Sequence, residues 1–238
     1  MKVVPDSYLA KTEAQQPEQV HPAQINFSNH GNNSVLKGAS DTLDFAWNKL
    51  GAIRELRNQP NPEFTPAKHD RTVREAVDVF DREWGSRWDA AKAALKTELS
   101  RVEGQLERTA NLRSNDKHFN SIVGTFQAMN PAERQEALGE LIEQQDGPTL
   151  AALLEAPALV SGIKADQREA IKVQLFSRAD PANYALRGQL DKALDKFEAA
   201  SLAAIRYRQA LREGTDRFDK RVAEAAERAA KATTGFAA

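Results

Sequence analysis

The sequence predicts an all-α fold: an elongated helical bundle with two long antiparallel helices, a cluster of short helices between them, and an extended N-terminal arm. Composition favours helix, because Ala and Leu dominate the apolar residues and Glu, Lys, Arg and Gln are abundant. Apolar residues recur at helical spacings over long stretches. Proline stands at the starts of these stretches, where its missing N–H costs nothing. At 238 residues the chain can bury a sizeable core.

Residues 1–39 are predicted to form the extended arm. Pro5, Pro17 and Pro22 interrupt this segment, and its apolar residues are isolated. Such a segment buries too little apolar surface to offset the entropy lost on ordering. We therefore expect it to lie against the body of the chain or against a neighbouring subunit. Ile25 and Phe27 are its candidate interaction residues.

Residues 40–114 are predicted to hold a first helix and the first long helix. Asp41 is the expected N-cap of a helix that reaches about Arg57. This helix places four apolar residues on one face: Leu43, Trp47, Leu50 and Ile53. Thr65 and Pro66 then supply the cap and the first position of the long helix.

The first long helix carries an apolar stripe with an eleven-residue period. The stripe comprises Val73, Val77, Phe80, Trp84, Trp88, Ala91, Leu95, Leu99, Val102, Leu106 and Ala110. Eleven residues make almost three helical turns, so the stripe runs nearly straight along the helix. Because Trp84 and Trp88 lie on it, we interpret both as core residues and not as a stacking platform for bases or a ligand. Gly85 is expected to let a partner backbone approach closely.

Residues 115–179 are predicted to form a subdomain of short helices that fold back on one another. The expected helices cover residues 118–129 and 165–177. Two further helices are opened by Asn130-Pro131 and Gly147-Pro148, because Pro suits the first position of a helix.

Residues 180–238 are predicted to hold the second long helix, from Asp180-Pro181 to about Lys231, and a C-terminal tail. One seam repeats strictly every seven residues: Leu190, Phe197, Ala204, Leu211, Phe218, Ala225 and Ala232. A mixed companion seam is expected at Leu194, Ser201, Arg208, Thr215, Val222 and Ala229. Ser201 and Arg208 stand where a coiled coil has apolar residues, which indicates a polar partner there or a partner that covers only part of the helix. Both are candidate interaction residues.

Charge and composition exclude several classes of function. The 33 basic and 34 acidic side chains nearly cancel, so the chain lacks the global field that draws proteins to nucleic acid or anionic membranes. There is no Cys, which excludes disulfides, thiolate nucleophiles and Cys-ligated zinc. The N-terminus has no signal-peptide core, and no run approaches the roughly 18 apolar residues that cross a bilayer. We expect a soluble protein with no membrane partner that is made in a cytoplasm.

The sequence contains no specific set of catalytic residues. His69-Asp70 and Asp116-Lys117-His118 place His near Asp, but neighbouring side chains diverge on a helix, so we favour surface residues over catalytic dyads. Neither metal-ligand spacing nor a phosphate-binding or dinucleotide-binding loop occurs. The chain is therefore predicted to be no enzyme and to need no metal or cofactor.

Nucleic-acid binding has one candidate segment, and we do not favour it. Arg206, Arg208 and Arg212 are candidate interaction residues that could contact phosphates, with Tyr207 stacking on a base. Acidic residues follow closely in the sequence and would weaken a phosphate footprint. A solvated helix face with local ion pairs is the preferred interpretation.

The leading functional hypothesis is a non-catalytic structural or assembly protein that acts through helix packing and its arm. Its expected partners are further copies of itself or other subunits of a larger assembly. The chain resembles minor virion components of tailed bacteriophages in its Cys-free helices rich in Ala, Glu and Arg behind a polar arm. That resemblance, one of composition over the whole chain, implies a capsid, connector or internal role in a virion. The alternative is a helical adaptor, regulator or secreted bacterial effector that binds a protein partner; an enzyme with a cryptic bundle site ranks last.

Overall fold

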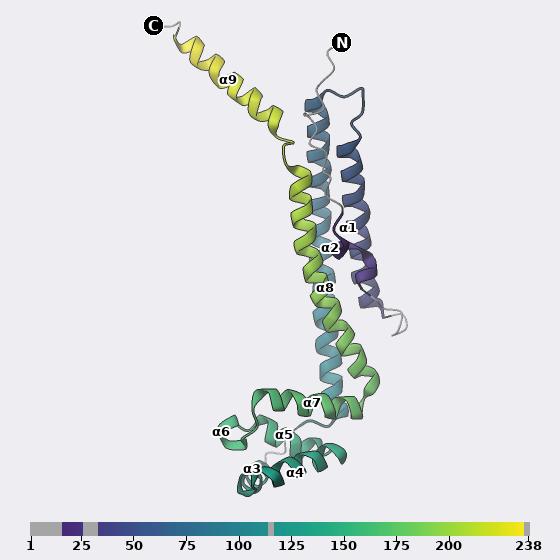
Figure 1. Cartoon of the computed structure of the whole chain (residues 1–238), viewed down its shortest axis with the longest axis vertical. Coiled ribbons are helices and arrows are strands. Elements are labelled where there is room, and N and C mark those ends of the chain that lie inside the picture. Colours follow the sequence, from purple (N-terminus) through teal and green to yellow (C-terminus); the bar gives the residue numbers. More distant parts are fainter. Residues whose placement is uncertain (1–15, 26–32, 114–116, 236–238) are drawn as a thin grey trace. The chain divides into compact units, whose positions relative to one another are not determined.

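The computed structural model describes residues 16–25, 33–113 and 117–235. Across these residues the regular structure is helical and contains no strand, which confirms the all-α prediction (Figure 1). The chain divides into two compact units. Unit 1 holds the described residues up to Leu95 and from Ala193 onward, and unit 2 runs from Lys96 to Lys192. The two long helices, α2 (Pro66–Thr109) and α8 (Pro181–Arg212), each continue from one unit into the other.

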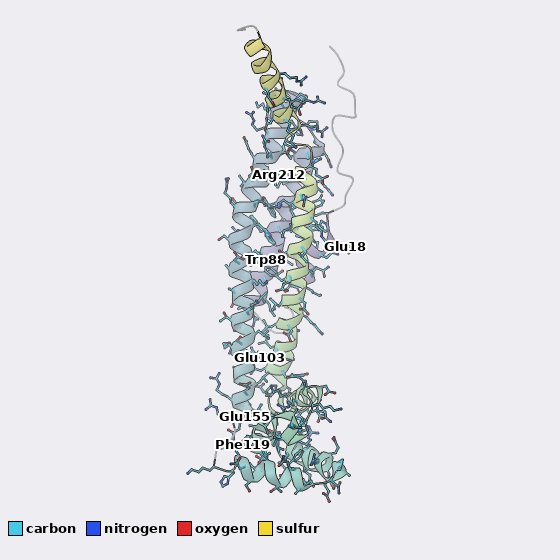
Figure 2. All side chains as sticks on the ribbon, turned by 90° about the vertical axis from the view of Figure 1, so that its left-hand side faces the viewer. Glu18, Trp88, Glu103, Phe119, Glu155 and Arg212 are labelled. Atoms are coloured by element: carbon cyan, nitrogen blue, oxygen red, sulfur yellow. The ribbon has the colours of Figure 1, made fainter. Side chains whose placement is uncertain are left out.

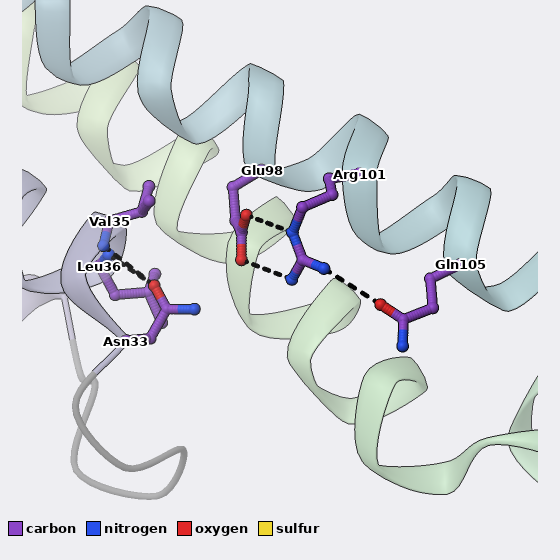
Figure 3. A network of polar contacts seen from close by, with 6 residues as sticks. All are labelled: Asn33, Val35, Leu36, Glu98, Arg101 and Gln105. Carbon is purple, nitrogen blue, oxygen red and sulfur yellow. Dashed lines mark hydrogen bonds and ion pairs between the residues drawn. The ribbon is translucent and has the colours of Figure 1, made fainter.

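Helix α1 (Ser34–Asn58) begins seven residues before the predicted N-cap Asp41. Its cap is Asn33, whose Oδ1 accepts hydrogen bonds from the backbone N–H groups of Val35 and Leu36, both at 3.1 Å (Figure 3). This cap satisfies donors that a helix start leaves without partners. The prediction of Asp41 was wrong, and residues 34–39 belong to the helix and not to an extended arm. The buried face of α1 repeats at spacings of three and four: Leu36, Ala39, Leu43, Ala46, Leu50 and Ile53.

The described part of the arm packs on α1 within the same chain. Two short 3₁₀ helices, η2 (Glu18–Val20) and η3 (Pro22–Gln24), contact α1. Val20 is fully buried, and Ser40 donates a hydrogen bond to the carbonyl of Pro22 at 3.3 Å. Trp47, predicted on the core face of α1, is only half-buried, and its ring and that of His21 form a T-shaped contact with the centroids 4.8 Å apart.

Helix α2 starts as predicted, with Thr65 Oγ1 accepting from the backbone N–H of Lys68 at 3.2 Å. In unit 1 its stripe is buried at Val73, Val77, Phe80, Trp84 and Leu95. Trp84 is 7% exposed. The half-buried Trp88, labelled in Figure 2, stacks on Phe197 of α8 with ring centroids 3.8 Å apart and planes 2° apart. The core interpretation of the two tryptophans is confirmed for Trp84. Trp88 packs in the contact between α2 and α8.

Helices α2 and α8 run antiparallel in unit 1, as predicted. Lys92 pairs with Glu198 at 2.8 Å, and Asp81 pairs with Arg208 at 2.9 Å. Residue numbers thus rise on α2 as they fall on α8. Gly85 is not a point of close approach, because a Cβ added there would have no heavy atom within 4 Å. That part of the prediction was wrong.

Unit 2 contains the short helices, close to their predicted positions. They are α3 (Phe119–Ala128), α4 (Pro131–Glu143), α5 (Gly147–Glu155), α6 (Ala158–Ser161) and α7 (Ala165–Ala179). Asn130 and Glu133 form the capping box expected at the start of α4. Arg168 braces the turn between α5 and α7 by donating hydrogen bonds to the carbonyls of Leu154 at 2.7 Å and Ile163 at 3.1 Å, and to that of Ala156.

The end of α2 in unit 2 carries its own polar contacts. Arg101 donates to both carboxylate oxygens of Glu98, at 2.7 and 2.9 Å, and to Gln105 at 3.0 Å (Figure 3). These lie at helical spacings of three and four, so they stabilise α2 locally. Arg187 of α8 pairs with Glu103 at 3.0 Å, which joins the two long helices inside this unit.

Candidate interaction surface

Two of the predicted interaction residues form ion pairs inside unit 1. Arg208 Nη1 lies 2.9 Å from Asp81 Oδ1, and Arg212 Nη1 lies 2.9 Å from Asp78 Oδ1. Both pairs are partly exposed, so each contributes at most about 1 kcal/mol to stability. Arg206 is exposed, and Ser201 is half-buried. The arginines therefore do not form one free basic patch, since two of the three are held by carboxylates of α2.

The companion seam of α8 lies one residue before the predicted one. Ala193, Ala200 and Tyr207 are 4%, 0% and 5% exposed, whereas Leu194, Ser201 and Arg208 are only half-buried. The three buried residues of this row alternate with a second buried row, and the two rows together have the regular spacing of a coiled-coil seam. The second row is Leu190, Phe197, Ala204 and Leu211. Placing the seam at Ser201 and Arg208 was wrong. The true seam is hard to see in the sequence because alanine occurs on both buried and exposed faces of helices. Tyr207 stands among arginines, a pattern that also suits a residue stacking on a base.

Burial removes Tyr207 from any base-stacking role. Its side chain is part of the unit 1 core, and burial raises the pKa of its hydroxyl above the usual value, against the opposing attraction of Arg54. Ile25, the other buried candidate, is 3% exposed and directly follows η3, which contacts α1. Phe27 lies outside the described residues.

A polar junction that was not predicted from the sequence lies at the C-terminal end of α8. Arg57, near the end of α1, donates hydrogen bonds to the backbone carbonyls of Ala210 at 2.9 Å, of Glu213 at 3.0 Å, and of Leu211. These are carbonyls of the kind that a final helical turn leaves without donors. Arg57 thus caps a helix that lies more than 150 residues further along the chain.

The predicted continuous helix from Asp180 to Lys231 is interrupted at residues 213–216 (Figure 1). Gly214 has a φ of +77°, a conformation that glycine adopts without strain. Thr215 Oγ1 donates to the carbonyl of Arg212 at 2.8 Å, and α9 (Arg217–Gly235) follows. The signal was present in the sequence, because Gly214-Thr215-Asp216 combines a helix-ending glycine with residues that favour caps.

His69 and Asp70 lie at the same end of unit 1. His69 is 2% exposed, so the surface interpretation was wrong for it, while His118 is exposed as expected. The Nε2 atom of His69 lies 3.4 Å from the carbonyl oxygen of Arg57. Burial raises the pKa of Asp70, although Arg217 and other neighbouring cations act in the opposite direction. Burial and the charge of Arg217 lower the pKa of Arg57.

A cavity of about 360 Å³ lies beside the junction, lined by Arg74, Gln209, Arg212, Glu213, Gly214, Thr215 and Asp216. Its cations are already compensated, because Arg74 bonds to Asp219 and Arg212 to Asp78. The mixed lining gives no excess charge that would select an anion. Over the described ranges, no group of three or more His, Asp or Glu residues is placed to hold a metal ion.

One of the two apolar rows of α8 does not continue in α9. Following the buried Ala193, Ala200 and Tyr207 at intervals of seven residues gives Gly214, Arg221 and Arg228. The neighbouring register, which is polar in α8 at Ser201 and Arg208, becomes apolar in α9 at Val222 and Ala229. The other row, which holds Leu211 in α8, continues as Phe218, Ala225 and Ala232, so α9 repeats only one of the two rows by which α8 packs in unit 1.

The apolar face of α9 is open where its side chains are described. Val222 is 68% exposed, and Ala225 is also exposed. The first turn is held to α2, because Asp219 bonds with Arg74 and lies 3.9 Å from Arg71. We define the α9 face as residues 218, 222, 225, 229 and 232, which share one side of the helix by their spacing.

The chain was compared with protein-family models, curated proteins and solved structures, and no match was found in any of the three. In the described ranges, no helix has the length and apolar character needed to traverse a lipid bilayer.

Proposed function

We propose that this chain is a non-catalytic structural protein that joins a larger assembly by docking its α9 face on another subunit. The observation that carries the proposal is the 68% exposure of Val222 on a helix whose second apolar row differs from that of α8. Amphipathic helices with an open apolar face commonly insert it into a groove of another protein. The composition typical of minor virion components makes a virion the setting that we propose.

The contacts of α8 support protein docking over nucleic-acid binding. Arg208 and Arg212 are engaged by carboxylates, and Tyr207 is buried. Phosphate binding needs cationic side chains that displace the counterions of the nucleic acid. Here carboxylates already neutralise two of the three candidate arginines.

Native material provides the test. Tagged chain expressed in its source should sediment with a particle that contains it at fixed stoichiometry, and electron microscopy should show that particle. Val222→Glu is expected to release the chain from the particle, while Lys220→Gln, on the opposite side of α9, should leave it bound. Recovery of the parent chain as a free monomer, or with one soluble client at variable ratio, would favour the adaptor, regulator or effector hypothesis.

A further inference from the structure

One edge of the α9 face carries two arginines, and the other edge carries small side chains and one aspartate. Arg221 and Arg228 are seven residues apart and border the face on the same side, and both are exposed. Arg228 lies 3.9 Å from Glu224 in a largely exposed pair, an arrangement that water and salt screen strongly. On the other border the register positions are Asp219, Ala226 and Thr233, and Asp219 is bonded to Arg74.

The face is built from small residues over most of its length. Phe218 and Val222 are its two larger side chains, and Ala225, Ala229 and Ala232 complete it. At about 1.5 Å per residue the 19-residue helix is about 28 Å long. Alanines let a partner approach closely but bury little area themselves, so the partner must supply the larger apolar side chains.

A second copy of α9 does not satisfy this face. In an antiparallel pair the two basic edges would oppose each other, so that Arg221 faces Arg228 of the other copy, which is unfavourable. In a parallel pair the basic edge would meet Ala226 and Thr233, which offer no carboxylate.

We propose that the α9 face binds an amphipathic helix of another protein that carries large apolar residues edged by carboxylates. Carboxylates on that edge would pair with Arg221 and Arg228, and the apolar residues would cover Val222 and Ala225. This inference rests on the proposed docking function and adds the chemistry of the partner.

The experiment uses the full-length chain and two synthetic peptides of about three heptads. Both peptides have leucine at the core positions; the acidic peptide has glutamate at both edge positions and the basic peptide has lysine there. Fluorescence anisotropy should show the acidic peptide binding at least about tenfold more tightly than the basic one, with a preference that declines as salt increases.

Variants assign the binding to the α9 face. Val222→Glu should weaken acidic-peptide binding by about tenfold or more, and because Val222 is exposed the variant should keep the helical circular dichroism of the parent. Arg221→Glu combined with Arg228→Glu should reverse the preference toward the basic peptide. Lys220→Glu, which makes the same type of charge change away from the face, should keep the acidic preference.

Several outcomes would overturn the inference. Equal binding of the two peptides would show that charge does not select the partner, and binding of neither peptide would show that the face does not dock helices of this kind. Concentration-dependent self-association that Val222→Glu abolishes would assign the face to a second copy. Either negative peptide result can coexist with recovery of the chain in a native particle, so it is distinguishable from failure of the proposed function.

Discussion

Phe197 and Trp88 form the ring contact that joins α8 to α2 in unit 1. Their centroids are 3.8 Å apart, and Phe197 is completely buried. Phe197→Ala would remove this stack and leave a cavity, so we expect it to lower the free energy of unfolding by about 3–5 kcal/mol. Urea unfolding followed by tryptophan fluorescence would measure the loss. Leu202→Ala, on the same helix but at a position 59% exposed, should change stability by less than about 0.5 kcal/mol.

Arg57 acts on the backbone of α8 and not on another side chain. Its guanidinium satisfies the carbonyls of Ala210, Leu211 and Glu213 at the helix end. Arg57→Ala would leave these acceptors without a protein donor, so a loss of about 1–3 kcal/mol is expected in the same unfolding measurement. Arg57→Lys should fall between the parent and Arg57→Ala, because an ammonium group lacks the planar fork. Equal stability of all three proteins would contradict the capping role.

Asp70 should make stability depend on pH. Burial holds its pKa above the usual value of 3.8, so the folded chain binds a proton in an interval where the unfolded chain has released it. The contribution of Asp70 to stability is therefore present below that interval and is lost as the pH rises through it. Asp70→Asn lacks this dependence, so its stability relative to the parent should increase with pH from about 4 upward, as denaturation at a series of pH values would show.

Asp216 provides a control of opposite sign. A hydrogen bond from Lys220 lowers the pKa of its carboxylate, so its contribution is present above the usual pKa and is lost as the pH falls through the folded value. The stability of Asp216→Asn relative to the parent should therefore decrease as the pH rises. Parallel slopes for the two variants would show that burial of Asp70 does not govern its titration.

At the scale of single helices, the break at Gly214 separates two apolar registers. Gly214 has a φ of +77°, and a side chain in that conformation costs about 1–2 kcal/mol. Gly214→Ala should destabilise unit 1 by about that amount. Gly85→Ala, at a helical position where an added Cβ would meet nothing within 4 Å, should instead stabilise it by about 0.5–1 kcal/mol. Tryptophan-monitored unfolding of the two variants should therefore shift in opposite directions.

Local signals predicted most elements well. Thr65-Pro66 and Asn130-Pro131 set helix starts through short-range hydrogen bonds, and these starts were confirmed. The missed features depend on distant parts of the chain. Whether Ala193 or Leu194 faces the core depends on which parts of the chain pack on α8, and the capping of α8 depends on Arg57. Periodicity alone does not specify these tertiary contacts.

The candidate interaction surface was predictable only in part. The exposed Val222 lies on the predicted companion seam, but its open position follows from the break at Gly214. Ser201 and Arg208 were singled out as departures from an apolar seam, and they proved to border the real one. A seven-residue repeat defines one row of a helix, and the side on which the second row lies depends on the partner helices.

At the scale of the whole chain, the two compact units can be monitored separately. All three tryptophans, Trp47, Trp84 and Trp88, lie in unit 1, whereas circular dichroism records helices of both units. Gly147 of unit 2 is buried, and an added Cβ would lie 2.0 Å from the carbonyl oxygen of Ala110. Because backbone must shift to relieve that clash, Gly147→Ala should destabilise unit 2 by at least about 1–3 kcal/mol.

This substitution should separate the unfolding transitions reported by the two probes. In Gly147→Ala, circular dichroism should lose part of its amplitude at lower urea concentrations than tryptophan fluorescence, because unit 1 retains its own core. Gly139→Ala, in helix α4 of the same unit and with no atom within 4 Å of the added Cβ, should leave the dichroism transition where it is in the parent or move it to higher urea. If both probes instead shift together in Gly147→Ala, then the continuous helices α2 and α8 couple the units into one cooperative transition, and the two units do not unfold independently.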